Sequence, residues 1–167
     1  MYYLFQTPAT IEDLASICKT PNRILKWMRL HIRHSGHDNI IKPPVKTLLE
    51  KKCSHLEFAW LFHDVLNEIG IFAYILTVNG NVKSVACAFD DEKGRIKCMV
   101  NRRLMFRTCK KIENAPDYID RDWYRWIEWA ILRGRLVPVK PHYRNGEDEA
   151  SDDTENYLLR NRLSSVR

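Results

Sequence analysis

The sequence predicts an α+β domain in which one central, buried helix packs against a small antiparallel sheet. Residues 1–70 contain segments whose apolar residues recur at helical spacing. Residues 71–100 contain three segments of strand length and composition, separated by turn sequences at 79–81 and 90–94. With 167 residues, the chain is long enough for one hydrophobic core and too short for two full domains.

Two helices are expected before residue 36. The first begins after Thr10, an N-cap residue, and continues through Cys18. Pro21 begins the second, because proline is favoured in the first turn of a helix. One face of this second helix is apolar, and another face carries the basic residues Lys26, Arg29 and Arg33.

The central helix is expected from about Leu56 to Ile69, and Gly70 ends it. Its apolar residues cover most of its circumference, as in a helix that is buried on several sides. A last, Trp-rich helix is expected within residues 118–134, YIDRDWYRWIEWAILRG, because Ile119, Trp123 and Ala130 recur at helical spacing.

The charge is distributed unevenly along the chain. Residues 147–155, EDEASDDTE, carry six carboxylates, and without them the formal net charge of +6 becomes about +12. We therefore expect one cationic domain in residues 1–142 and an acidic, flexible tail in residues 143–167. A cationic domain favours polyanions or acidic proteins as partners.

Several classes of site are not expected. The five cysteines are odd in number and never spaced as C-x-x-C, which argues against a disulfide framework and a zinc ribbon. His31, His34 and His37 do not have the spacing of a standard zinc site, so we expect neither a metal nor a cofactor. No run of about 18 apolar residues and no signal peptide is present, which predicts a cytoplasmic protein without membrane contact.

Residues 51–74, KKCSHLEFAWLFHDVLNEIGIFAY, contain the pairs Phe58-Ala59 and Leu61-Phe62 and the segment GIFAY at 70–74. With these motifs, residues 20–101 resemble the transglutaminase-like superfamily, a branch of the papain-like cysteine enzymes. The resemblance implies a nucleophile helix followed by antiparallel strands. It also implies a thiolate at the N-terminus of that helix, a histidine on a neighbouring strand and a carboxylate that orients the histidine.

The sequence departs from that family at each catalytic position. An alignment without gaps places His55 at the nucleophile position and Cys53 at the preceding glycine position. Two residues correspond to a rotation of about 200° on a helix, so Cys53 is out of register. The positions of the family's histidine and acid fall at residues 83–85 and 100–101, and no histidine occurs between residues 81 and 101. The resemblance therefore implies a catalytically degenerate scaffold, a pseudoenzyme.

Two alternatives to a nucleic-acid-binding pseudoenzyme remain open. In the first, Cys53 acts with His55 and an orienting Glu57, or with a distant histidine such as His142, in a cysteine-dependent amidase, peptidase or acyltransferase. In the second, the chain is an inhibitory protein-binding module that uses its Trp-rich segment.

The leading expectation is binding of nucleic acid, or of a protein that processes it, through a basic and aromatic surface. The size and cationic body are also similar to those of phage-encoded transcription-terminating proteins that act on host RNA polymerase, which implies a role in transcription regulation. The expected nucleic-acid-binding residues are Lys26, Arg29, Arg33, Lys51, Lys52, Arg102, Arg103, Arg107, Lys110 and Lys111. The expected partner-binding residues are Trp123, Trp126, Trp129, Arg125 and Arg133.

Overall fold

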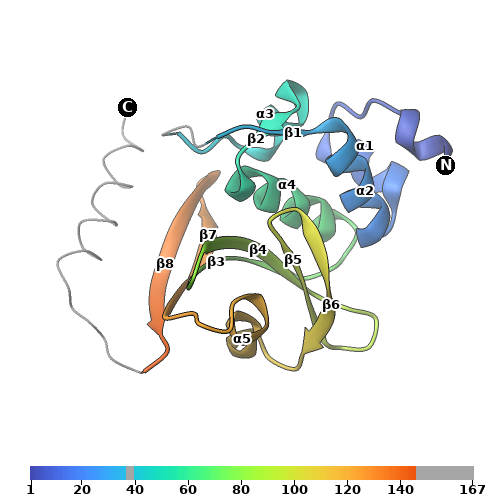
Figure 1. The fold of residues 1–167 in the computed structure, drawn as a ribbon. Helices are drawn as coiled ribbons and strands as arrows, with labels where there is room; N and C mark the ends of the chain where they lie inside the picture. Colours follow the sequence, from blue (N-terminus) through green and yellow to red (C-terminus); the bar gives the residue numbers. More distant parts are fainter. Residues whose placement is uncertain (37–39, 146–167) are drawn as a thin grey trace.

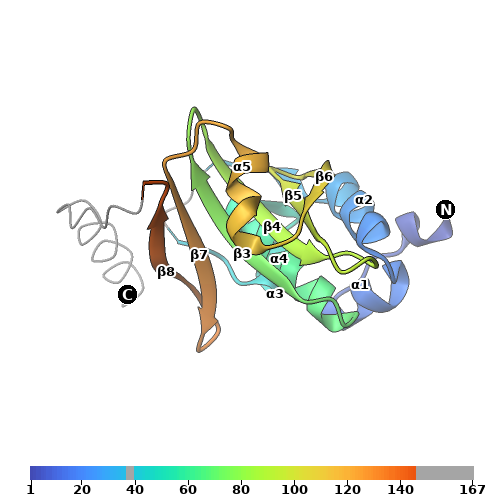
Figure 2. The ribbon, with the colours of Figure 1, turned by 90° about the horizontal axis from the view of Figure 1, so that it is seen from below.

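The computed structural model describes residues 1–36 and 40–145 and shows an α+β fold, as predicted (Figure 1). Four helices cover one face of a six-stranded antiparallel sheet, and a short fifth helix, α5, lies against the other face (Figure 2). The expected acidic tail lies outside the described residues from residue 146 onward. Tyr143, the first residue of that expected tail, belongs to the last strand.

Helices α1–α4 precede the strands of the large sheet in the sequence, and η2 and α5 lie between its strands β6 and β7. The helical elements are η1 (Tyr2–Phe5), α1 (Ile11–Cys18), α2 (Pro21–His31), α3 (Pro44–Glu50), α4 (His55–Glu68), η2 (Ile112–Asn114) and α5 (Ala115–Ile119). The strands are β1 (Arg33–His34), β2 (Lys52–Cys53), β3 (Ala73–Asn79), β4 (Lys83–Asp90), β5 (Ile96–Val100), β6 (Arg103–Cys109), β7 (Arg125–Leu132) and β8 (Arg135–Tyr143). The large sheet has the order β6-β5-β4-β3-β7-β8, and β1 and β2 form a separate parallel pair.

The first two helices begin where predicted, after Thr10 and at Pro21. The Thr10 side chain accepts a hydrogen bond from the Asp13 amide at 3.0 Å, and the Thr20 side chain accepts one from the Arg23 amide at 3.4 Å. These bonds satisfy backbone donors that have no partner inside the helix. The apolar faces of both helices pack onto α4.

Helix α4 is the centre of the helical layer. Its side chains Phe58, Phe62 and Leu66 are fully buried among α1, α2 and the facing strands. Burial of each such side chain stabilises the fold by about 1.5–3 kcal/mol relative to an exposed position. Gly70, with a φ of +82°, ends the helix as predicted, because glycine adopts this left-handed conformation without steric cost. The central helix of the prediction is therefore confirmed.

The Trp-rich segment forms strand β7, so the prediction of a C-terminal helix is wrong. Trp129 packs into the core on the helical side of the sheet, and Trp126 packs into the core on the α5 side. Residues that are an odd number apart point to opposite faces of a strand. Because both faces of the sheet are covered, this strand is apolar on both sides, and its tryptophan spacing of three imitates a helical repeat.

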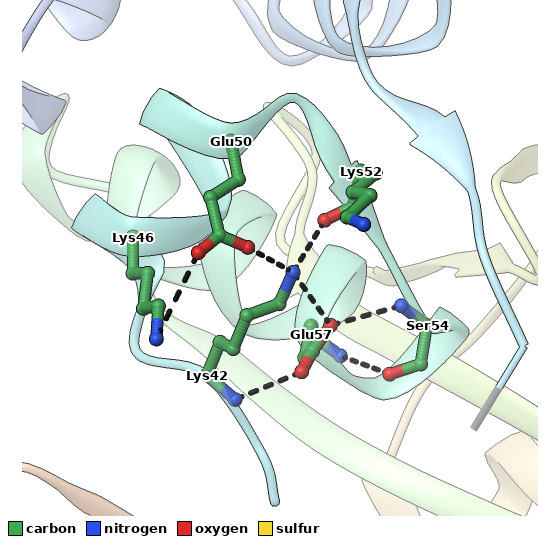
Figure 3. A network of polar contacts seen from close by, with 6 residues as sticks. All are labelled: Lys42, Lys46, Glu50, Lys52, Ser54 and Glu57. Atoms are coloured by element: carbon green, nitrogen blue, oxygen red, sulfur yellow. Dashed lines mark hydrogen bonds and ion pairs between the residues drawn. The ribbon is translucent and has the colours of Figure 1, made fainter. Parts of the chain in front are cut away.

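A buried ionic network fixes the start of α4 (Figure 3). The Glu57 carboxylate accepts hydrogen bonds from the Lys42 amide at 2.8 Å and the Ser54 amide at 3.0 Å. The Ser54 side chain accepts a bond from the Glu57 amide at 3.3 Å, which completes a capping box. The Lys42 ammonium donates to Glu50 and to the Lys52 carbonyl at 2.8 and 2.7 Å. Three segments of the chain are thereby joined at one point.

Glu57→Ala should destabilise the protein strongly, because it leaves the buried Lys42 ammonium without the nearby Glu57 carboxylate and removes half of the capping box. The expected loss in the free energy of unfolding is about 3–5 kcal/mol. Urea unfolding followed by tryptophan fluorescence measures it. Lys46→Ala is the matched control, because it removes only an exposed ion pair to Glu50 at 3.7 Å and should cost less than about 1 kcal/mol. Equal losses in the two variants would contradict this account.

Candidate nucleic-acid interface

The end of α2 lies beside the segment that leads into α4. Strands β1 and β2 pair in parallel, with Arg33 opposite Lys52 and His34 opposite Cys53. The Arg33 amide donates a hydrogen bond to the Lys51 carbonyl at 2.9 Å. The exposed basic residues Arg33 and Lys52, which are distant in the sequence, are thus held next to each other.

The turn between β5 and β6 joins this region from the sheet. The Arg102 guanidinium donates a hydrogen bond to the Ile32 carbonyl, and its carbon atom Cζ lies 4.6 Å from the centre of the Phe58 ring in the first turn of α4. Burial lowers the pKa of Arg102, and the nearby positive charge of Arg29 lowers it further. Arg102 therefore anchors the turn to the end of α2, and its charge interacts with that of Arg29.

The structure brings six of the ten expected nucleic-acid-binding residues to the N-terminal end of α4. We call this surface the basic end, and it consists of Arg29, Arg33, Lys51, Lys52, Arg102 and Arg103. All of these residues except Arg102 are exposed. Lys26 is exposed one turn earlier on α2 and extends the surface.

The remaining three expected residues are not at the basic end. Arg107 lies in β6, and Lys110 and Lys111 follow the last residue of this strand. Arg103 pairs with Val100 at one end of the β5–β6 ladder, whereas Cys109 pairs with Ile96 at the other. Strand β6 therefore leads away from the basic end.

The three tryptophans of residues 123–129 do not form the expected contact surface, which is a correction. Trp123, Trp126 and Trp129 are 8%, 4% and 6% exposed. The Trp123 indole donates to Asp117 at 2.7 Å, and the Trp129 indole donates to the Thr77 hydroxyl at 3.1 Å. The indole nitrogens of Trp123 and Trp129 are thus used inside the domain.

The two arginines expected beside these tryptophans lie far apart along the β7–β8 hairpin. Arg125 is half-buried at the start of β7, where it pairs with Asn79 of β3. Arg133 is exposed in the turn that joins β7 to β8. They do not frame an exposed tryptophan, because the three indoles are in the core.

Cys53 has the environment of a structural thiol. Its side chain is fully buried in β2, immediately before the capping residue of α4. Burial raises the pKa of the thiol to about 12, and the positive charge of Arg102 offsets this only in part. The nucleophilic form of cysteine is the thiolate, so Cys53 is held in its unreactive form at neutral pH.

The proposed partners of Cys53 are engaged in other contacts. Glu57 binds two backbone amides, which occupies the carboxylate that would have to orient His55. The His55 ring stacks on His34, with ring centres 4.2 Å apart and an angle of 21° between the planes. His142 stacks on Trp126 in the β7–β8 hairpin, at a ring distance of 4.1 Å.

Val85 and Asn101 are neighbours in the sheet, and each lies within one of the two ranges, 83–85 and 100–101, at which the resemblance would place the histidine and the acid. The Asn101 side-chain oxygen accepts a hydrogen bond from the Val85 amide at 2.9 Å, and the Asn101 amide donates to the Val85 carbonyl at 2.9 Å. An isopropyl group and an amide cannot transfer a proton as an imidazole and a carboxylate do. This pair has a structural function, since it fixes the turn that carries Arg102.

Phe106 is a surface residue that the sequence interpretation missed. It lies in β6 between two of the expected arginines, and its side chain is 101% exposed. A sequence signal was present, because this aromatic residue stands inside the basic run NRRLMFRTCKK at 101–111. The sequence interpretation considered only the basic residues of this run.

The remaining features of the site concern metals and membranes. Residues 1–36 and 40–145 contain no group of three or more His, Cys, Asp or Glu side chains arranged to hold a metal ion. Within the same residues, every helix is too short or too polar to cross a membrane.

Comparison of the sequence with models of known protein families and with curated proteins found no match.

Iodoacetamide should label Cys53 slowly in the folded protein at neutral pH. A thiol pKa of about 12 instead of the ordinary value of about 8.5 lowers the thiolate fraction at neutral pH roughly 3,000-fold. Mass spectrometry of the Cys53 peptide measures the labelling rate, and the same protein in guanidinium chloride is the control. Rapid labelling of the folded protein at Cys53 alone would show an activated thiol and support the cysteine-enzyme alternative.

Proposed function

We propose that this chain is a non-catalytic nucleic-acid-binding protein, built on a catalytically degenerate transglutaminase-like scaffold, and that the basic end contacts phosphate groups. The observation that carries the proposal is the convergence of three cationic segments, residues 26–33, 51–52 and 102–103, at one end of the domain. Like charges held together repel one another and oppose folding. A polyanionic partner compensates for that cost.

The surroundings of the basic end support an external partner. Arg29, Arg33, Lys51, Lys52 and Arg103 form no ion pair with an Asp or Glu side chain of the described residues. The Glu50 carboxylate nearby is already bound by Lys42 and Lys46. The five exposed cationic groups of the basic end are therefore available for phosphate contacts. Such contacts need positive charge on one face of the protein and no particular catalytic chemistry.

Two observations support the scaffold part of the proposal. Helix α4 is followed by the antiparallel strands β3, β4 and β5, which is the order that the family resemblance implies. Val85 and Asn101, which belong to the ranges 83–85 and 100–101 that the resemblance implies for the histidine and its acid, are hydrogen-bonded to each other. The buried Cys53 thiol supports loss of the chemistry, because its raised pKa disfavours the thiolate.

A protein that processes nucleic acid, such as RNA polymerase, is the alternative partner. An acidic protein surface would fit the basic end by the same charge complementarity. Binding of purified RNA polymerase that survives nuclease treatment, together with no binding of free oligonucleotides, would favour this partner over nucleic acid.

Charge reversal at the basic end should abolish most binding. We expect the triple variant Arg29→Glu, Arg33→Glu, Arg103→Glu to bind labelled DNA or RNA at least about 10-fold more weakly than the unchanged protein in 100 mM salt. The slope of log K against log salt should become shallower by about 2–3. Each lost phosphate contact reduces the magnitude of that slope by about 0.9, and the triple variant removes up to three contacts. Fluorescence anisotropy between 50 and 200 mM salt measures both quantities.

The matched control carries the same change of charge elsewhere. Lys93→Glu, Arg121→Glu and Lys140→Glu alter three exposed residues in the β4–β5 turn, after α5 and on β8. This variant should retain affinity within a few-fold, with circular dichroism confirming that both triple variants fold. Equal weakening by the two variants would show that only net charge matters, and the basic end would lose its role.

A further inference from the structure

Phe106 is the most exposed large apolar side chain among the described residues. It stands in a bulge of β6, the strand at the edge of the sheet. The register pairs Lys97 with Thr108 and Met99 with Leu104. Residues 105–107 of β6 therefore lie opposite the single residue Cys98 of β5, and the extra residues protrude from the ladder.

The bulge separates Phe106 from both hydrophobic cores. Leu104 packs against the core on the helical side of the sheet, and Met105 packs against the core on the α5 side. Both faces of the strand are thus occupied by the two preceding side chains, and Phe106 points into solvent. An aromatic ring in water gains no stabilisation from burial in the free protein, so the whole ring is available for contact with a partner.

Basic residues surround this ring along the strand. Arg103 and Arg107 are exposed on β6, and Lys110 is exposed just after it. Arg103 also belongs to the basic end, so the bulge continues the cationic surface away from α4. An aromatic ring flanked by cations matches a nucleotide, whose base stacks on the ring while its phosphates meet the positive charges.

We propose that Phe106 stacks on an unpaired base of single-stranded nucleic acid, and that Arg103 and Arg107 contact the phosphates on either side. This inference rests on the proposed function and specifies the class of ligand. In a duplex the faces of the bases are covered by their neighbours, and only base edges and phosphates are accessible. A protruding ring can reach the face of a base only when the strand is unpaired.

The experiment compares two fluorescein-labelled 15-mers in 100 mM salt, oligo(dT) and an abasic oligonucleotide with the same phosphates. Phe106→Ala should weaken binding of oligo(dT) roughly 5- to 140-fold, which corresponds to the loss of one base stack. Binding of the abasic 15-mer should change less than about 2-fold. The same variant should also leave binding of a 15-base-pair duplex unchanged.

Two further variants separate stacking from apolar contact and from misfolding. Phe106→Trp should keep or raise the affinity for oligo(dT), whereas Phe106→Leu, which is apolar without a π-face, should behave like Phe106→Ala. Phe72→Ala is the matched control, because Phe72 is also an exposed phenylalanine, at 59%. Its neighbour is acidic where those of Phe106 are basic, since the Phe72 carbonyl accepts a hydrogen bond from the Asp90 amide. This control should leave all affinities unchanged.

The outcomes distinguish this inference from the proposed function. Loss of affinity in the charge-reversal variant, with oligo(dT) affinity unchanged in Phe106→Ala, would overturn the stacking proposal and leave the basic end in place. Equal weakening for the abasic 15-mer would also overturn it. If Phe106→Ala changes the sedimentation coefficient instead, the ring is a contact between copies of the chain. If the unchanged protein binds no oligonucleotide, the proposed function itself fails.

Discussion

The buried Glu57 carboxylate determines where α4 begins, and much of the functional surface is positioned from that point. It binds the Lys42 and Ser54 amides and lies 3.9 Å from the Lys42 ammonium, which in turn binds the Lys52 carbonyl. Residues 51–53 are thereby held beside α4, and their pairing with β1 holds the end of α2. A buried charge is tolerated only when such bonds satisfy it. Loss of one partner therefore leaves a buried charge exposed to a large energetic cost and destabilises the whole arrangement.

The basic end combines fixed and mobile charges. Arg102 is tied to the Ile32 carbonyl and to the Phe58 ring, which makes it part of the domain's interior as much as of its surface. Arg29, Arg33 and Arg103 extend into solvent around it. A rigid central cation surrounded by long, adaptable side chains suits a ligand with regularly spaced phosphates, because the flexible groups can adjust to its path. The Asn101 side chain supports the turn that presents Arg102, because its oxygen accepts a hydrogen bond from the Val85 amide.

The sequence predicted the elements whose signals are local. Thr10, Pro21 and Gly70 are start and stop signals that need no distant partner, and three central strands had clear composition and turns. The edge strands were missed, because a bulge breaks the alternation of β6 and Pro138 and Pro141 interrupt β8. The basic residues of the site were predictable as a set, but their grouping was not. It depends on long-range contacts such as the one from Arg102 to Ile32.

The bulge in β6 also has a consequence for how the molecule behaves in concentrated solution. An open edge of a sheet can recruit the edge of another chain, which begins aggregation. Three residues opposite one leave the outer amides and carbonyls of β6 out of line with a regular neighbouring strand. The exposed Arg103 before the bulge and the exposed Arg107 within it add repulsion between identical copies. The same irregularity that displays an aromatic ring therefore opposes pairing of another chain with this edge of the sheet.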